Sequence, residues 1–194
     1  MGVETDGRGD GPAAGEEQWL ARLAADERKA FEEVAAAYRH RVAALAYRLL
    51  GWDGEAEDVV QDVFLAVLRN LRRFGGRSSL WTWLAAITIN RCRSLRRRRL
   101  IRLRFLSRLW SRPAANDPPG GPEQAETFQR VRQAVRALPT KLREVAVLRY
   151  LEEMPVEQVA QVVGASRNVV QVRLHRARAI LKHSLVGLIE DRGP

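Results

Sequence analysis

Apolar residues recur every three or four positions through most of this chain, and no stretch alternates apolar and polar residues over the length of a strand. This period predicts helices. The first is capped by Asp26 and closed by Gly51, and the second begins after Asp53. A third, longer helix follows the break FGGR and is capped by Ser78 or Ser79. The first part of the chain is therefore predicted to be all-α.

A second helical block follows a segment rich in proline and glycine. Residues 111–124, SRPAANDPPGGPEQ, have the composition of a linker. Pro139 begins a further helix after an apolar stripe. That stripe comprises Phe128, Val131, Val135 and Leu138. The fold class predicted is all-α, with two small helical domains joined by a flexible linker.

The boundaries follow from these composition changes. We place a disordered tail at residues 1–18, a first domain at 19–105, a linker at 106–124 and a second domain at 125–190.

The stretch 155–181 has the pattern of a helix-turn-helix. Gly164 supplies the left-handed turn that ends one helix, Ser166 caps the next, and Ala160 is small enough to let the two cross closely. The inward face of the second helix comprises Val170, Leu174, Ala177 and Leu181. Its outward face comprises Asn168, Val172, His175 and Arg176, flanked by Arg167, Gln171 and Arg173. The turn residues favour a helix that enters a DNA major groove over a merely solvated basic helix.

Charge is both large and segregated. The 194 residues carry 33 basic and 23 acidic side chains, a net charge of +10. Residues 1–62 hold 14 acids and 7 bases, whereas residues 63–122 hold 14 bases and one acid. Such an excess favours a polyanionic partner, with nucleic acid ahead of an anionic membrane surface. The separation indicates at least two distinct binding surfaces.

Cys92 is the only cysteine, so neither an intramolecular disulfide nor a cysteine-based zinc site can form. The three histidines lie far apart, and we expect no metal and no cofactor. The glycine-rich, acidic start of the chain is the opposite of a signal peptide, and no apolar run approaches the ~18 residues of a membrane span. We expect a soluble, cytoplasmic protein without membrane insertion.

An acidic patch is predicted on the second helix. Asp58, Gln61 and Asp62 share one side of it, with Leu65 beside them, which suits a basic groove on a partner protein. Helix-dipole and solubility effects alone are the alternative. A metal pair of a nuclease, formed by Asp58 and Asp62, would lack a third ligand.

Two tryptophans open the third predicted helix, which then becomes heavily basic. Aromatic rings beside cations are suited to holding an unstacked single strand. Trp83 shares a stripe with Leu84 and Ile87 and is expected in the core. Trp81 points elsewhere and is the candidate for stacking on a base.

Both halves of the chain resemble the extracytoplasmic-function (ECF) sigma factors of bacterial RNA polymerase. In the first half the motifs are AEDVVQDVFLAVL at 56–68 and WTWLAAITINRCRSLRRRR at 81–99. In the second half the motif is ALPTKLREVAVLRYLEEMPVEQVAQVVGASRNVVQVRLHRAR at 137–178. The resemblance covers roughly residues 28–100 and 125–185. It implies a sigma region 2 followed by a sigma region 4.

The resemblance assigns a role to each domain. The first would bind the clamp of core polymerase and melt the −10 element, and the second would bind the flap and read the −35 element. The clamp contacts of the family match Asp58, Gln61, Asp62 and Leu65. The predicted −10 contacts are Trp81, Asn90, Arg91, Arg93, Arg97 and Arg98. The predicted −35 contacts are Arg167, Asn168, Gln171, Val172, Arg173 and Arg176.

The chain departs from the family pattern at a few positions. VVQVR stands where the family usually has TVKSR, so that Val169, Gln171 and Val172 replace threonine, lysine and serine. Ser94 stands where the family has aspartate. These changes affect the promoter sequence that is read rather than the role of the domain.

The resemblance also implies an anti-sigma factor as a partner, beside the polymerase and promoter DNA. We find no catalytic constellation and expect no enzyme activity. The alternative function is a stand-alone helix-turn-helix regulator of transcription. For the basic segment 95–112, contact with an anionic membrane surface is the alternative to a role beside polymerase.

Overall fold

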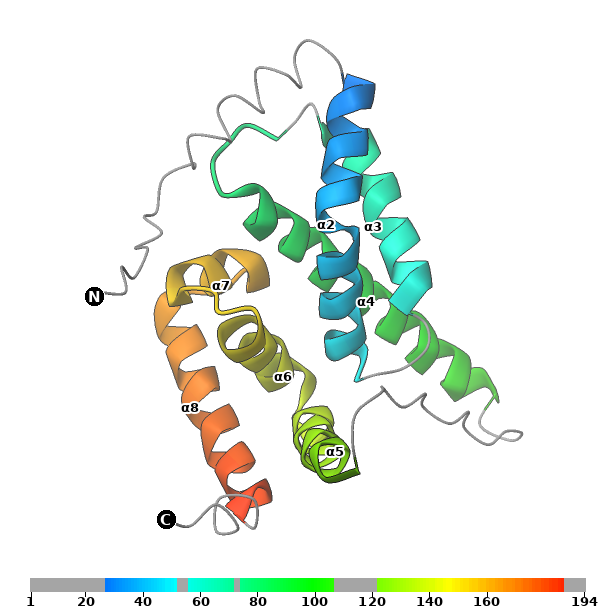
Figure 1. Cartoon of the computed structure of the whole chain (residues 1–194). Helices are drawn as coiled ribbons and strands as arrows, with labels where there is room; N and C mark the ends of the chain where they lie inside the picture. The colour runs from blue at the N-terminus through cyan, green and yellow to red at the C-terminus, as the bar shows by residue number, and fades with distance from the viewer. Residues whose placement is uncertain (1–26, 52–55, 72–73, 107–121, 187–194) are drawn as a thin grey trace.

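The computed structural model describes residues 27–51, 56–71, 74–106 and 122–186, and every regular element in these ranges is helical, which confirms the predicted all-α class (Figure 1). The elements in order are α2 (Glu27–Leu50), α3 (Ala56–Asn70), α4 (Leu80–Leu106), α5 (Pro122–Ala137), α6 (Thr140–Ala146), the π-helical turn η2 (Val147–Leu151), α7 (Val156–Val163) and α8 (Arg167–Ser184).

Helices α2, α3 and α4 pack against one another and form the first domain. Their apolar stripes meet in a core whose fully buried side chains include Leu45, Leu49, Val63, Leu84 and Ile89. Burying a side chain of this size contributes about 1.5–3 kcal/mol. The core is therefore built from the residues whose helical spacing predicted it.

The chain breaks at the ends of these helices as expected. Gly51 follows α2 with φ +80°, a left-handed conformation that suits glycine. The hydroxyl of Ser79 accepts a hydrogen bond from the backbone N–H of Thr82 at 3.2 Å, which identifies Ser79 as the cap of α4. The predicted caps Asp26 and Asp53 lie outside the described residues.

The second domain contains the predicted helix-turn-helix. Gly164 ends α7 with φ 67° and ψ 46°, the left-handed conformation. The Ser166 side chain accepts a hydrogen bond from the backbone N–H of Val169 and caps α8. The inward side chains Val170, Leu174 and Ala177 are buried. The helix-turn-helix prediction is confirmed.

One position of the predicted apolar stripe in α5 is wrong. Phe128 is 65% exposed, whereas Val135 and Leu138 are buried. Val131 is half-buried and packs against the core, so the stripe holds from Val131 to Leu138 and fails at Phe128.

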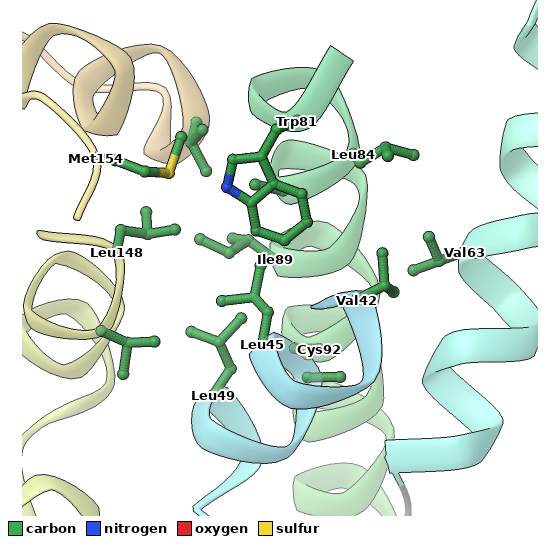
Figure 2. Packing of buried hydrophobic residues seen from close by; sticks show 14 of the residues in the cluster. Val42, Leu45, Leu49, Val63, Trp81, Leu84, Ile89, Cys92, Leu148 and Met154 are labelled. Atoms are coloured by element: carbon green, nitrogen blue, oxygen red, sulfur yellow. The ribbon is translucent and has the colours of Figure 1, made fainter. Parts of the chain in front are cut away.

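The two domains are in contact. Helix α4 packs against α7, and one buried cluster contains side chains of both domains. Figure 2 shows Leu148 and Met154 of the second domain facing Trp81 of α4, with Leu45 and Leu49 of α2 nearby. The linker expected between the domains lies mostly outside the described residues, and the domain boundaries stay a prediction.

Candidate nucleic-acid and partner interfaces

The predicted acidic patch lies on the outer side of α3. Asp58, Gln61 and Leu65 are exposed and Asp62 is half-buried, while the valines on the opposite side of α3 fill the core. Leu65 is 50% exposed, and the neighbouring Leu68, which sequence reasoning did not single out, is 45% exposed. Two exposed leucines beside carboxylates make a surface suited to a partner that is basic and partly apolar.

Helix α4 presents two different sides, and the predicted −10 residues are divided between them. Asn90, Arg97 and Arg98 are exposed, and Arg91 is half-buried on the same side. A pocket of about 320 Å³ opens on this side, between α3 and α4. It is lined by Ala66, Asn70, Trp83, Ile87, Asn90, Arg91 and Ser94. We call this side, from Trp83 to Arg98, the open face of α4.

The other side of α4 is covered by the second domain. Trp81 is only 7% exposed. Its ring is stacked on Tyr38 with centroids 6.1 Å apart, and the guanidinium of Arg41 lies 3.9 Å from its centroid. Met154 and Leu148 lie on its remaining side (Figure 2). The indole Nε1 is buried without a hydrogen-bond partner.

The expectation that Trp81 is free is therefore wrong, whereas Trp83 packs against the core as expected but is not fully buried. Trp83 is half-buried, is tilted against Phe74 at 5.1 Å between centroids, and lines the pocket on the open face. Trp81 is covered because the second domain packs there. Helical spacing separates the two rings but does not tell which side a distant domain covers.

Arg93 is also held at the domain contact. Its guanidinium donates to both carboxylate oxygens of Glu144, at 3.1 Å and 2.7 Å, and to the carbonyl oxygen of Val163 at 3.3 Å. Arg96 lies 3.8 Å from the same carboxylate. Glu144 is 2% exposed, so this is a buried ion pair between α6 and α4.

The surroundings of this ion pair change the basicity of both arginines. The hydrogen bond to Glu144 raises the pKa of Arg93, because it stabilises the charged guanidinium. Burial lowers the pKa of Arg96, since the charged form is removed from water. Neither arginine is left free to contact a phosphate while the domains are together.

A second buried acid repeats the arrangement. Glu152, which follows η2, is 8% exposed and pairs with Arg41 and Arg48 of α2 at 3.3 Å and 2.5 Å. Sequence reasoning missed both Glu144 and Glu152. Their partners lie between 48 and 111 positions away, so neither pair can be inferred from local spacing.

Cys92 lies one residue before Arg93 and is buried. Burial raises the pKa of its thiol to about 12, and the charge of Glu144 adds to this while that of Arg96 opposes it. The ordinary pKa of a cysteine thiol, as in the unfolded chain, is 9.0. The folded state therefore holds this proton to higher pH than the unfolded state does.

We therefore expect Cys92 to lower the free energy of unfolding at alkaline pH. Stability from this group is complete below pH 9 and is lost as the pH rises toward 12, at a rate of up to about 1.4 kcal/mol per pH unit. Urea unfolding of the wild type and Cys92→Ala across this range measures it. The stability difference between the two proteins should change with pH; parallel curves would contradict the expectation.

The outer face of α8 is exposed as the helix-turn-helix requires. Asn168, Gln171, Val172 and Arg176 are exposed, and Arg173 is half-buried. Arg167 instead pairs with Glu157 of α7 at 3.1 Å, within the second domain. All six predicted −35 residues lie on α8. Among the residues that the structure describes, Arg167 is the one of the six that forms an ion pair within the domain.

Other classes of site find no support in the described ranges. There, no three histidine, cysteine or carboxylate residues come together in a way that could hold a metal ion. None of the helices that the structure describes has an apolar stretch of the length needed to cross a bilayer.

Comparison with known proteins matches the two domains in order. Residues 34–100 match sigma-70 region 2 and residues 128–181 match sigma-70 region 4. The ECF RNA polymerase sigma factor SigE of Mycolicibacterium smegmatis is 32% identical over 160 residues, which cover 80% of this chain and 61% of SigE. The ECF sigma-E factor of Escherichia coli K12 is 28% identical, covering 87% of this chain and 93% of that protein.

Solved structures agree with this fold. The structure of CnrH in complex with the cytosolic domain of CnrY has a TM-score of 0.63 and 27% identity, covering 91% of this chain and 97% of CnrH. The fold and surfaces define a two-domain helical protein with a helix-turn-helix in its second domain. The chain belongs to the sigma-70 family of RNA polymerase sigma factors, in its ECF group.

Proposed function

We propose that this protein binds bacterial core RNA polymerase and directs it to promoters through a −10 and a −35 element. The observation that carries the proposal is the presence, on one chain, of three surfaces: the acidic patch of α3, the open face of α4 and the helix-turn-helix of α7 and α8. A stand-alone regulator would need only the last of these.

The acidic patch of α3 is the proposed contact with the polymerase clamp. Asp58, Gln61 and Asp62 supply charge and hydrogen-bond acceptors, and Leu65 beside them supplies apolar area. Charged groups of this kind fix the orientation of a partner. The apolar group contributes most to the binding free energy when the partner removes it fully from water.

The open face of α4 is the proposed contact with the −10 element. Asn90 offers an amide for a base edge, and Arg91, Arg97 and Arg98 offer positive charge along the backbone path. Trp83 supplies an aromatic wall at the pocket on this face. Trp81 and Arg93 could join this set only after the two domains separate, because Glu144 and Met154 now lie against them.

Helix α8 is the proposed reader of the −35 element as duplex. Asn168, Gln171 and Val172 are exposed in its first two turns, which is where recognition helices of this motif contact base edges. Arg176, which is exposed, and Arg173, which is half-buried, would contact phosphates or guanine edges. Arg167, held by Glu157, would position α7 against α8 rather than read a base.

The remaining expectations belong to the same proposal. The protein would act in the cytoplasm as a specificity subunit without catalytic activity of its own. CnrH binds the cytosolic domain of CnrY, and the family resemblance implies an anti-sigma factor. We propose that such a partner also binds this chain.

Transcription from a promoter library tests the proposal. Core polymerase, the protein and templates with randomised −10 and −35 regions are combined, and the transcribed templates are sequenced. Enrichment of two sequence elements at a fixed spacing supports the proposal. Tight binding of the protein alone to a duplex, with no complex with core polymerase, would instead indicate the stand-alone regulator.

Replacing Trp83 with alanine should slow promoter opening, because one base loses an aromatic wall worth about 1–3 kcal/mol. Opening by the reconstituted holoenzyme is followed by the fluorescence of 2-aminopurine within the −10 element, and binding to −35 duplex is the control. Trp81→Ala is the matched variant, since it should change the domain contact first. An unchanged opening rate in Trp83→Ala would argue against a role for this ring.

A further inference from the structure

The outward face of α8 carries two apolar side chains where a DNA-reading helix is usually polar. Val169 is 40% exposed and Val172 is 51% exposed. They lie three positions apart and so share a side of the helix. Their neighbours on the outer face are polar or basic, namely Asn168, Gln171, His175 and Arg176. The valines are too few for a core and too exposed to contribute to the buried side of α8.

Their position along the helix is fixed by its N-terminus. Ser166 caps α8 by accepting from the backbone N–H of Val169, so Val169 lies in the first turn and Val172 at the start of the second. In this motif these are the turns that contact base edges. Arg167 is engaged by Glu157 and does not compete for that place.

The chemistry of the two side chains limits what they can read. An isopropyl group neither donates nor accepts a hydrogen bond, so a donor or acceptor of a base pressed against it would lose water without compensation. The only apolar group that a base pair exposes in the major groove is the C5 methyl group of thymine. Methyl against methyl is therefore the favourable contact.

We propose that Val169 and Val172 select thymines at neighbouring positions of the −35 element by packing on their C5 methyl groups. Arg176, four positions after Val172, continues the same stripe and supplies the charge that holds the helix on the groove. This inference rests on the proposed function and names the base chemistry that the helix reads.

Deoxyuridine substitution tests the inference, because it removes only the methyl group. The −35 element enriched from the library is bound by the holoenzyme with each thymine replaced in turn by deoxyuridine. At the positions that are read, affinity should fall about fourfold per methyl group, the amount expected for one lost apolar group. Replacement of thymines outside the −35 element should change nothing.

A variant completes the comparison. In the Val169→Ala and Val172→Ala double variant, thymine and deoxyuridine templates should bind alike, because the protein side of the contact is gone. Val186→Ala is the matched control, since Val186 is 40% exposed but lies after the end of α8. Thermal unfolding followed by circular dichroism checks that the double variant is folded.

The outcomes separate the two proposals. A −35 element without thymine at these positions, equal affinity of the wild type for both templates, or a methyl effect that persists in the double variant would each overturn the readout by valine while leaving the sigma function intact. Absence of any promoter-dependent binding by the wild type would overturn both. Loss of polymerase binding, rather than of thymine preference, would identify the valines as a protein contact and likewise overturn the inference.

Discussion

Replacing Glu144 with alanine is expected to separate the two domains. The change removes the carboxylate that pairs with Arg93 and Arg96 and leaves two guanidinium groups at a largely apolar contact. Breaking a buried ion pair by removing one partner costs about 3–5 kcal/mol, and the partial exposure of both arginines reduces this to about 2–3 kcal/mol. Small-angle scattering should show a larger radius of gyration, and urea unfolding should show the loss of stability.

Glu157→Ala is the control for this result. Glu157 also pairs with an arginine, but the pair lies within the second domain and its side chains are 47% and 64% exposed. Pairs of that kind contribute about 0–1 kcal/mol, so this variant should keep the wild-type radius. A Glu144→Ala protein that remains as compact as the Glu157→Ala protein would show that the apolar contact alone holds the domains.

Reversing the charge at Asp58 is expected to prevent assembly with core polymerase. In Asp58→Arg an exposed carboxylate of the acidic patch becomes a cation that would face the basic groove proposed for the clamp. Like charges brought together at an interface cost several kcal/mol, which corresponds to a loss of affinity of about 100-fold or more. Equilibrium titration of labelled core polymerase measures the change.

Glu32→Arg on α2 is the matched reversal. Glu32 is 62% exposed and pairs with Arg28, four positions away, in an exposed helical pair. It changes net charge by the same amount as Asp58→Arg, so any difference between the variants reports the position rather than the charge. Equal loss in both would assign the effect to long-range electrostatics and count against the α3 patch as the docking surface.

The sequence was sufficient where local chemistry decides the structure. The left-handed turn at Gly164, the cap at Ser166 and the closure of α2 at Gly51 each depend on one residue type in one backbone conformation. Helical spacing likewise placed the valines of α3 and the inner face of α8. These features need no knowledge of distant parts of the chain.

What could not be predicted depends on pairs that are far apart in sequence. Arg93 and Glu144 are 51 positions apart, and neither differs locally from a solvated charge. The same holds for Trp81, because helical spacing does not show that Met154 and Leu148 of the second domain lie against it. The choice between Trp81 and Trp83 depends on which side a second domain covers, and that is a property of the whole fold.

The packing of Trp81 against Tyr38 and Arg41 also provides an optical signal. An indole in that setting is shielded from water and lies against a cation, and separation of the domains would expose the side of the ring that Met154 and Leu148 now cover. Its emission should then shift to longer wavelength. The difference in emission between the wild type and Trp81→Phe would follow the opening of the protein without an attached dye, both during titration with polymerase and in competition with an inhibitory partner.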